Sequence, residues 1–130
     1  MKLSYFMIHV RDLDESIHFY RDLLGMELER TYTENECIEV AFLVEKGQRA
    51  MIDQPIIELV CGFPNSDTTQ SGYEIGFSVD SVSEISTKLM AAGYRPVNES
   101  VVLEDNMKTV KFNGPEGIKI ELVQQNAMEE

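Results

Sequence analysis

Two short stretches of the sequence repeat each other, and this repeat constrains the fold more than any other feature. Residues 56–60 read IIELV and residues 119–123 read KIELV, so IELV recurs 63 positions later (121 − 58 = 63). The run YFMIHV at 5–10 likewise aligns with EIGFSV at 74–79 (74 − 5 = 69). Self-similarity of this kind indicates two copies of one structural unit.

Each half of the chain predicts the same order of elements: a strand, a helix and three more strands. In the first half a helix is expected at 12–24, because Asp12 and Glu15 have the capping-box spacing and Gly25 suits a helix end. The strands of this half are expected at 3–10, 26–33, 37–45 and 55–62.

The second half repeats these signals. Ser81 and Glu84 have the capping-box spacing, Ile85 and Leu89 form a helical face, and Gly93 closes the helix. The segment PEG at 115–117 predicts the last hairpin turn. The strands of this half are expected at 73–80, 94–102, 107–113 and 118–125.

The expected fold class is therefore α+β, with two βαβββ modules that form cupped, partly open antiparallel sheets. The 130 residues suit a single domain. Within it we expect module 1 at 1–62, a linker at 63–72, module 2 at 73–125 and a frayed tail at 126–130.

Charge and cysteine content exclude several classes of function. The formal net charge of −12 opposes binding to nucleic acid or to anionic membrane surfaces, so we expect neither partner. Cys37 and Cys61 make neither a disulfide framework nor a zinc knuckle and are expected as small core residues. No stretch resembles a signal peptide or a membrane span, so a cytoplasmic location is expected.

The repeat also relates four polar side chains. Tyr5 is equivalent to Glu74 and Glu58 to Glu121, and in each strand alternation places the residue on one face of the sheet. One such glutamate alone is best explained as part of a solvated face. Four polar groups at related positions, Tyr5 and three glutamates, predict a shared centre, where carboxylates repel unless a divalent cation or a shared proton compensates them.

The phrases YFMIHVRDLDESIHFYRDLLGM, GYEIGFSVD and GPEGIKIELV resemble the vicinal oxygen chelate superfamily, which includes glyoxalase I, bleomycin-binding proteins and extradiol dioxygenases. The resemblance spans about residues 3–125 and is nearest to small bacterial glyoxalase I. It implies metal ligands at the following four positions: Tyr5, Glu58, Glu74 and Glu121. Glu58 and Glu121 match the glyoxalase pattern, whereas Tyr5 and Glu74 stand where glyoxalase I has histidines.

An all-oxygen set of this kind favours manganese or magnesium over nickel or zinc, and a site without metal is the alternative. His9 stands where glyoxalase I has an arginine for glutathione, so glutathione is not expected as a substrate. We expect Met7 and His9 to line the substrate pocket, although His9 also fits a satisfied strand histidine. His18 is expected on the solvated side of its helix.

The resemblance leaves three functions to compare. The first is a metal-dependent lyase, isomerase or epimerase acting on a small vicinal-oxygen substrate, with Glu121 or Glu58 as catalytic base. The second is a metal-free small-molecule binding protein of the bleomycin-resistance type. The first function ranks slightly ahead of the second. An extradiol dioxygenase or thiol-transfer enzyme ranks last, because it needs two histidines and one carboxylate on the metal. By resemblance we also expect a homodimer, with the site formed either within one chain or across two.

Overall fold

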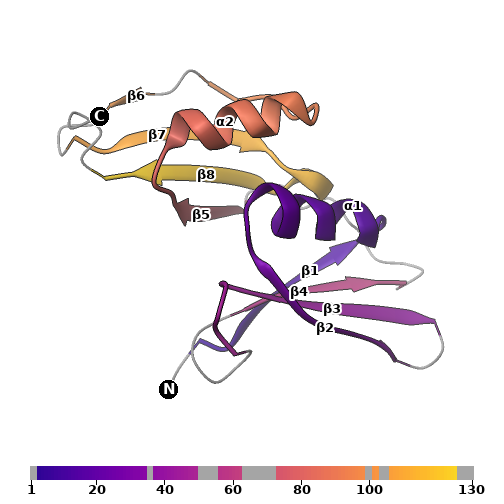
Figure 1. Ribbon diagram of the computed structural model, residues 1–130. Helices are drawn as coiled ribbons and strands as arrows, with labels where there is room; N and C mark the ends of the chain where they lie inside the picture. The colour runs from indigo at the N-terminus through magenta and orange to yellow at the C-terminus, as the bar shows by residue number, and fades with distance from the viewer. Residues whose placement is uncertain are drawn as a thin grey trace. The chain divides into compact units, whose positions relative to one another are not determined.

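The computed structural model describes residues 3–34, 37–49, 56–62, 73–98, 101–102 and 106–125. The chain divides into two compact units, unit 1 spanning Met1–Thr68 and unit 2 spanning Thr69–Glu130 (Figure 1). The predicted linker at 63–72 and the predicted tail at 126–130 lie outside the described residues.

Unit 1 combines a four-stranded sheet with one helical segment. Its strands are β1 (Tyr5–Val10), β2 (Glu27–Glu34), β3 (Ile38–Val44) and β4 (Ile56–Cys61). The helical segment between β1 and β2 consists of α1 (Leu13–Ile17) and η1 (His18–Leu23). The strands lie in the order β1-β4-β3-β2, so that β1 and β2 are the edges of the sheet.

Unit 2 has the same order of elements. Its strands are β5 (Glu74–Ser78), β6 (Val101–Val102), β7 (Lys108–Asn113) and β8 (Lys119–Gln124), and its helix is α2 (Val82–Ala91). A single 3-10 turn, η2 (Pro115–Gly117), connects β7 to β8 where the PEG turn was predicted. The sheet order is β5-β8-β7-β6, which matches that of unit 1. The predicted fold class is thus confirmed.

One strand pair in each unit is parallel and so departs from the antiparallel pairing that was expected. β1 runs parallel to β4, and β5 runs parallel to β8, while the other named pairs are antiparallel. A helix that follows the first strand carries the chain back across the sheet, and this crossover permits parallel pairing. Each sheet is therefore mixed.

The two sheets also have equivalent register. Met7 lies opposite Glu58 in the β1–β4 pair, and Gly76 lies opposite Glu121 in the β5–β8 pair. The spacings that relate the two halves of the sequence reproduce this pairing, since 7 + 69 = 76 and 58 + 63 = 121. Both glutamates therefore occupy the same place in their own sheet.

The predicted helices begin at the expected caps. The Asp12 carboxylate accepts a hydrogen bond from the Glu15 amide at 3.0 Å, and the Ser81 hydroxyl accepts one from the Glu84 amide at 3.1 Å. The first helix is α-helical only to Ile17 and continues as a π-helix, which corrects the expectation of one regular helix at 12–24. The wider turn buries Phe19, Tyr20 and Leu23 together.

The strand expected at 94–102 is largely absent among the residues described there. Only Val101 and Val102 form β6, and Pro96 makes one isolated bridge to Phe112. Proline has no amide hydrogen to donate to a ladder, so pairing is interrupted at this position. The segment still follows β7, because the Val97 amide donates to the Lys111 carbonyl at 2.7 Å.

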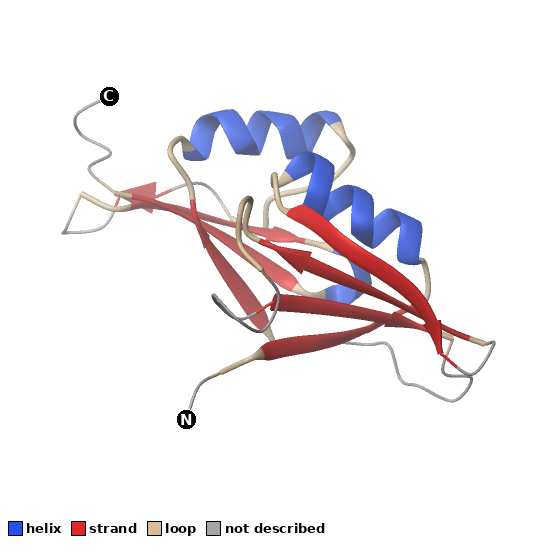
Figure 2. Cartoon of the chain, turned by 60° about the horizontal axis from the view of Figure 1, so that its bottom comes forward, coloured by secondary structure: helices blue, strands red, loops and turns tan. Residues whose placement is uncertain are grey.

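In each unit the helix covers one face of the sheet and leaves the other face without a helix (Figure 2). In unit 1 the face with Ile8, Leu43 and Leu59 is almost completely buried, whereas the opposite face carries the exposed Tyr5 and Met7. In unit 2 the buried face carries Val110, Phe112, Ile120, Leu122 and Gln124. Strand alternation places Glu58 and Glu121 on the faces opposite these cores.

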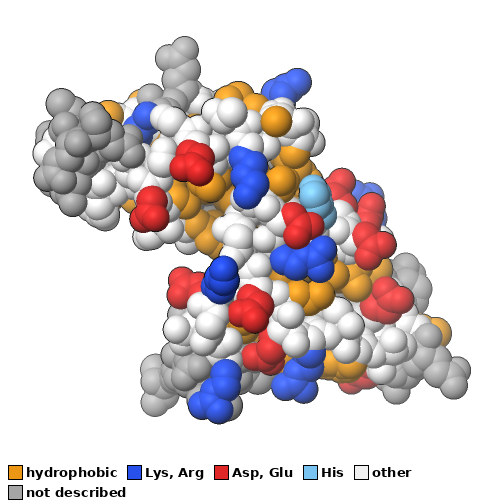
Figure 3. Space-filling view, in the orientation of Figure 1, with side chains coloured by type: hydrophobic (Ala, Val, Ile, Leu, Met, Phe, Trp, Pro, Cys, Tyr) orange, Lys and Arg blue, Asp and Glu red, His pale blue; other side chains and the backbone are white. Residues whose placement is uncertain are grey.

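Acidic and basic side chains are interspersed on the surface seen in Figure 3. Among the described residues, none of the helices has the length and apolar character needed to cross a membrane.

Cys37 is exposed and Cys61 is partly exposed, so the expectation that both are core residues is wrong. Their strand-like neighbours suggested burial, but Cys37 precedes β3 instead of lying within it.

Candidate functional site

In unit 1, Glu58 lies at the centre of a row of side chains that crosses the sheet. Its register partners are Met7 on β1 and Phe42 on β3, and Phe42 lies opposite Arg30 on β2. Opposite residues share a face of the sheet, so these four side chains lie side by side. The Glu58 carboxyl therefore has a methionine on one side and an aromatic ring on the other.

The surroundings of Glu58 are mainly apolar. The side chain is only 9% exposed, and a buried cluster shares its face: Val40, Phe42, Val44, Ile56 and Val60. Burial raises the pKa of the Glu58 carboxyl, and the negative charge of Glu34 raises it further. At a given pH, the protonated fraction of Glu58 is therefore larger than that of an exposed glutamate. A protonated carboxyl can donate a hydrogen bond.

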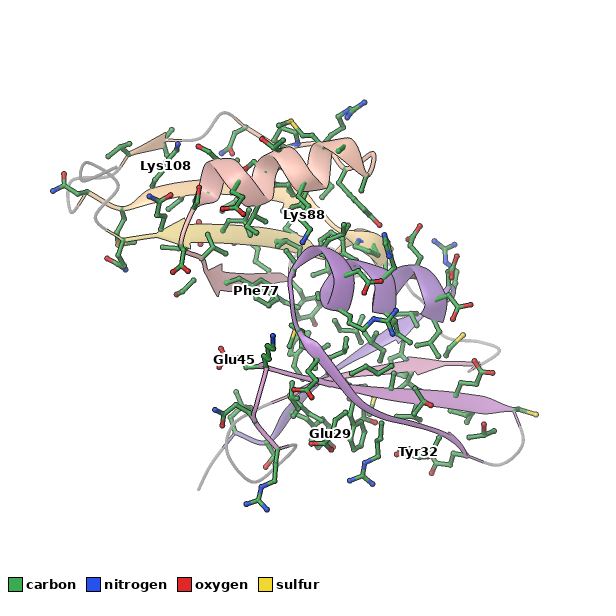
Figure 4. All side chains as sticks on the ribbon, in the orientation of Figure 1. Glu29, Tyr32, Glu45, Phe77, Lys88 and Lys108 are labelled. Atoms are coloured by element: carbon green, nitrogen blue, oxygen red, sulfur yellow. The ribbon has the colours of Figure 1, made fainter. Side chains whose placement is uncertain are left out.

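The other sequence-predicted residues of unit 1 lie on the same face as Glu58. Tyr5 and Met7 are 45% and 40% exposed on the edge strand β1, and His9 is half-buried opposite Val60. At the other edge Tyr32, labelled in Figure 4, is 41% exposed and packs edge-on against Phe42, with 5.7 Å between ring centroids. This face is therefore an apolar surface with aromatic rings and one buried carboxyl.

In unit 2 the equivalent face is charged. Glu121 lies between Gly76 on β5 and Lys111 on β7. The Lys111 ammonium donates to Oε1 of Glu74 at 3.0 Å. The hydrogen bond and charge of Glu74 raise the pKa of Lys111, and the charge of Glu121 contributes to the increase. Lys111 thus forms an ion pair with Glu74 and is also the cross-strand neighbour of Glu121, the other predicted glutamate of this unit.

The two equivalent glutamates consequently have different neighbours. The β3 partner of Glu58 is Phe42, whereas the β7 partner of Glu121 is Lys111. An apolar neighbour disfavours a carboxylate and a cationic neighbour stabilises one. The two units therefore have a glutamate at the same position, but the side chain beside it is apolar in unit 1 and cationic in unit 2.

Sequence reasoning missed Lys111, although the hairpin contained the signal. The PEG turn fixes the register of its two strands, and Asn113 lies opposite Lys119. Counting two residues back along one strand and two forward along the other places Lys111 opposite Glu121 (113 + 119 = 111 + 121). A short turn sets hairpin register, so this pairing could have been found without a structure.

The residues of unit 2 do not fit a divalent metal ion. Glu74 already accepts a hydrogen bond from the Lys111 ammonium, and Glu121 is the cross-strand neighbour of the same lysine. A cation bound by these carboxylates would repel that ammonium and would have to displace it. Within either unit, the described residues bring no three histidine, cysteine or acidic side chains together as a metal site.

Comparison with known proteins places this geometry in a family. Residues 2–122 match the model of the "Glyoxalase/Bleomycin resistance protein/Dioxygenase superfamily". The chain is 30% identical over 128 residues to a lactoylglutathione lyase of Salmonella typhimurium, covering 95% of this chain and 93% of the relative. It is 32% identical over 122 residues to the uncharacterized protein YwbC of Bacillus subtilis, covering 90% and 92%.

A solved structure agrees with these sequence relationships. The crystal structure of a glyoxalase family protein from Bacillus cereus superposes with a TM-score of 0.82 at 25% identity, covering 96% of this chain and 94% of that protein. The family model spans far more than half of the chain. The chain therefore belongs to the glyoxalase/bleomycin resistance protein/dioxygenase superfamily.

Proposed function

We propose that this protein is a small-molecule binding member of the superfamily whose site works without a divalent metal ion. The observation that carries the proposal is the 3.0 Å contact between the Lys111 ammonium and Glu74, with Glu121 beside the same lysine. An internal ammonium supplies the positive charge that converging carboxylates need. A metal ion is then not the only possible source of positive charge beside Glu74 and Glu121.

The ligand class follows from the Glu58 face of unit 1. Tyr5, Met7 and Tyr32 expose large apolar surfaces there. Small-molecule sites commonly combine apolar and aromatic walls with a few polar groups that fix orientation. The Glu58 carboxyl can donate a hydrogen bond to a ligand oxygen when it is protonated and can accept one from a ligand hydroxyl when it is ionised. The ligand class is therefore a largely apolar small molecule that carries a hydrogen-bonding oxygen.

Metal content tests this proposal directly. The protein is purified without chelator, its manganese, magnesium, nickel and zinc are measured by mass spectrometry, and manganese is then titrated in by calorimetry. We expect no stoichiometric metal and no saturable heat. One equivalent of tightly held divalent ion per chain, lost in Glu74→Gln and in Glu121→Gln, would refute the metal-free site.

The second candidate is a metal-dependent lyase, isomerase or epimerase. Two observations favour it: relatives at about 30% identity carry the name lactoylglutathione lyase, and Glu58 and Glu121 match the family's pattern. In that case Glu121 or Glu58 is the base, and manganese or magnesium is the expected ion. Turnover of the hemithioacetal of methylglyoxal and glutathione, assayed with each metal added, would identify it, and we expect no turnover.

The homodimer expected from the resemblance is part of this proposal. The edge strand β1 exposes Tyr5, Phe6 and Met7, and Leu3 is exposed just before it. Exposed apolar side chains grouped in this way are typical of a contact surface. Sedimentation velocity at several protein concentrations measures the oligomeric state. A mass of one chain at every concentration would rule out the dimer without affecting the ligand proposal.

A further inference from the structure

Unit 2 contains a pocket of about 330 Å³ between α2 and β7. Its helical wall includes Ser83, Ser86, Thr87 and Met90, and its floor includes Val110 and Phe112 of β7. This volume is at the lower end of the range of small-molecule sites. The pocket lies entirely within unit 2, and all of its lining residues are described.

The sequence explains why a space remains here. Val82 and Leu89 are the buried residues of α2 and are 1% and 0% exposed. The neighbouring helical positions towards the pocket carry the short side chains of Ser83, Ser86 and Thr87. Short side chains cannot reach the strand beneath, so a gap remains in an otherwise close-packed contact. The short β6 strand adds little sheet on this side.

The pocket and the Lys111–Glu74 pair lie on opposite faces of the unit 2 sheet. Val110 and Phe112 alternate with Lys111 along β7, and successive side chains of a strand point to opposite faces. The Glu58 face belongs to unit 1. The pocket is therefore separate from every residue assigned to the proposed ligand site.

A positively charged side chain adjoins the pocket at Ser83. Lys108 of β7 donates from its ammonium to the Ser83 hydroxyl at 2.9 Å, and Figure 4 shows it beside the first turn of α2. Ser83 is also part of the pocket wall. The rest of the lining is largely apolar, and Met90 is 42% exposed at its edge. A cation at one end of an apolar pocket matches an amphipathic anion.

From this arrangement we infer that the α2–β7 pocket is a second binding site, one that takes a small carboxylic acid with an apolar body. The carboxylate binds Lys108 and the Ser83 hydroxyl. The apolar body lies against Val110, Phe112 and Met90. Methionine adapts readily to ligands of different shape, which suits an exposed residue at the edge of such a site.

Nuclear magnetic resonance with ¹³C-methyl methionine tests this inference. Sodium octanoate is titrated into the full chain, and the Met90 methyl signal, identified by its loss in Met90→Leu, is followed. Octan-1-ol is the control ligand, because it has an alkyl chain of comparable length and a hydroxyl group in place of the carboxylate. We expect a saturable shift of the Met90 signal with octanoate and weaker binding of octanol.

Lys108→Gln should weaken octanoate binding about fivefold, equivalent to about 1 kcal/mol at 1.4 kcal/mol per tenfold, and leave octanol binding unchanged. The matched control Lys88→Gln, on the exposed side of α2, should leave both unchanged. Thr87→Leu, which fills the pocket, should abolish both. Absence of a saturable shift of the Met90 signal would overturn the binding site. If Lys108→Gln leaves octanoate binding unchanged, the assignment of the site to a carboxylic acid is overturned.

Discussion

The Lys111 ammonium lies 3.0 Å from Oε1 of Glu74, and Lys111 is also the cross-strand partner of Glu121. The single positive charge of the lysine thus offsets one of the two negative charges of Glu74 and Glu121, the residues that the family resemblance marks as ligands in unit 2. Its side chain is 35% exposed and that of Glu74 is 43% exposed, so the ion pair contributes little to folding stability. Its main effect is on what the carboxylates can bind.

Removing the ammonium should therefore create affinity for a divalent cation. We expect Lys111→Met to bind manganese at least tenfold more tightly than the wild-type protein, because two uncompensated carboxylates favour a hard cation. Titration calorimetry measures the change. Lys108→Met on the other face of the same strand is the control, and it removes the same formal charge.

The double variant Lys111→Met/Glu74→Gln separates coordination from general electrostatics. It should lose most of the gained affinity if Glu74 binds the ion. Equal manganese affinity in Lys111→Met and Lys108→Met would show that only the net charge of the protein matters, and the metal-free proposal would then lose its main support.

Glu58 should make stability depend on pH in the opposite sense to an ion-paired carboxylate. Its pKa is raised by burial and by Glu34, so ionisation costs stability in the folded state. The cost is absent below the unfolded-state pKa near 4.3 and is complete once pH exceeds the raised folded-state value. Glu58→Gln should thus increase the free energy of unfolding at about pH 7, by up to ~1 kcal/mol.

Urea denaturation at about pH 7 and about pH 3.5 measures this effect, and the gain should disappear at the lower pH. Glu39→Gln is the control, because Glu39 is an exposed glutamate on the neighbouring strand β3. A Glu58→Gln variant that is less stable than the wild-type protein at about pH 7 would mean that the carboxylate is stabilised in the fold.

Gln124 should contribute to stability through one buried hydrogen bond. It is 2% exposed, and its Oε1 accepts from the amide of Val82, the first residue of α2, at 2.8 Å. Gln124→Ala leaves that amide without an acceptor at a buried helix start, and we expect a loss of about 2 kcal/mol in urea denaturation. The adjacent exposed Gln125→Ala should change stability by less than ~0.5 kcal/mol. Equal losses in both variants would contradict this role.

Local patterns predicted much of each unit. The caps at Asp12 and Ser81 and the turn at 115–117 depend on neighbouring residues and were found from sequence alone. Strand alternation also placed Tyr5, Met7 and His9 on one face of the first strand, and the β1–β4 register shows that this is the face of Glu58. Signals of this kind are short-range, and a single sequence contains them in full.

Features that depend on distant partners were predicted less well. The parallel pairing of β1 with β4 joins residues about fifty positions apart, and no local pattern specifies it. The apolar environment of Glu58 arises because Phe42 reaches it across a β3–β4 register that no short turn fixes. Lys111 was also missed, although the three-residue turn that determines its register made its pairing with Glu121 predictable. The sequence thus located the glutamates but not the groups that set their charge.

Gly62 should tolerate substitution less well than other glycines with positive φ. It follows β4 with φ +115°, and a Cβ at this position would collide with the carbonyl oxygen of Cys37 just before β3. Both the backbone conformation and the contact with Cys37 therefore require glycine. We expect Gly62→Ala to lower the free energy of unfolding by more than ~2 kcal/mol.

Gly47→Ala is the matched control, because Gly47 has φ +85° and no atom lies within 4 Å of the added Cβ. This variant should lose only the cost of placing an alanine in the left-handed region, about 1 kcal/mol. Urea denaturation of both variants isolates the steric part of the effect at Gly62. If the two variants lose the same amount, the close approach between Gly62 and Cys37 does not restrict the β3–β4 end of the sheet.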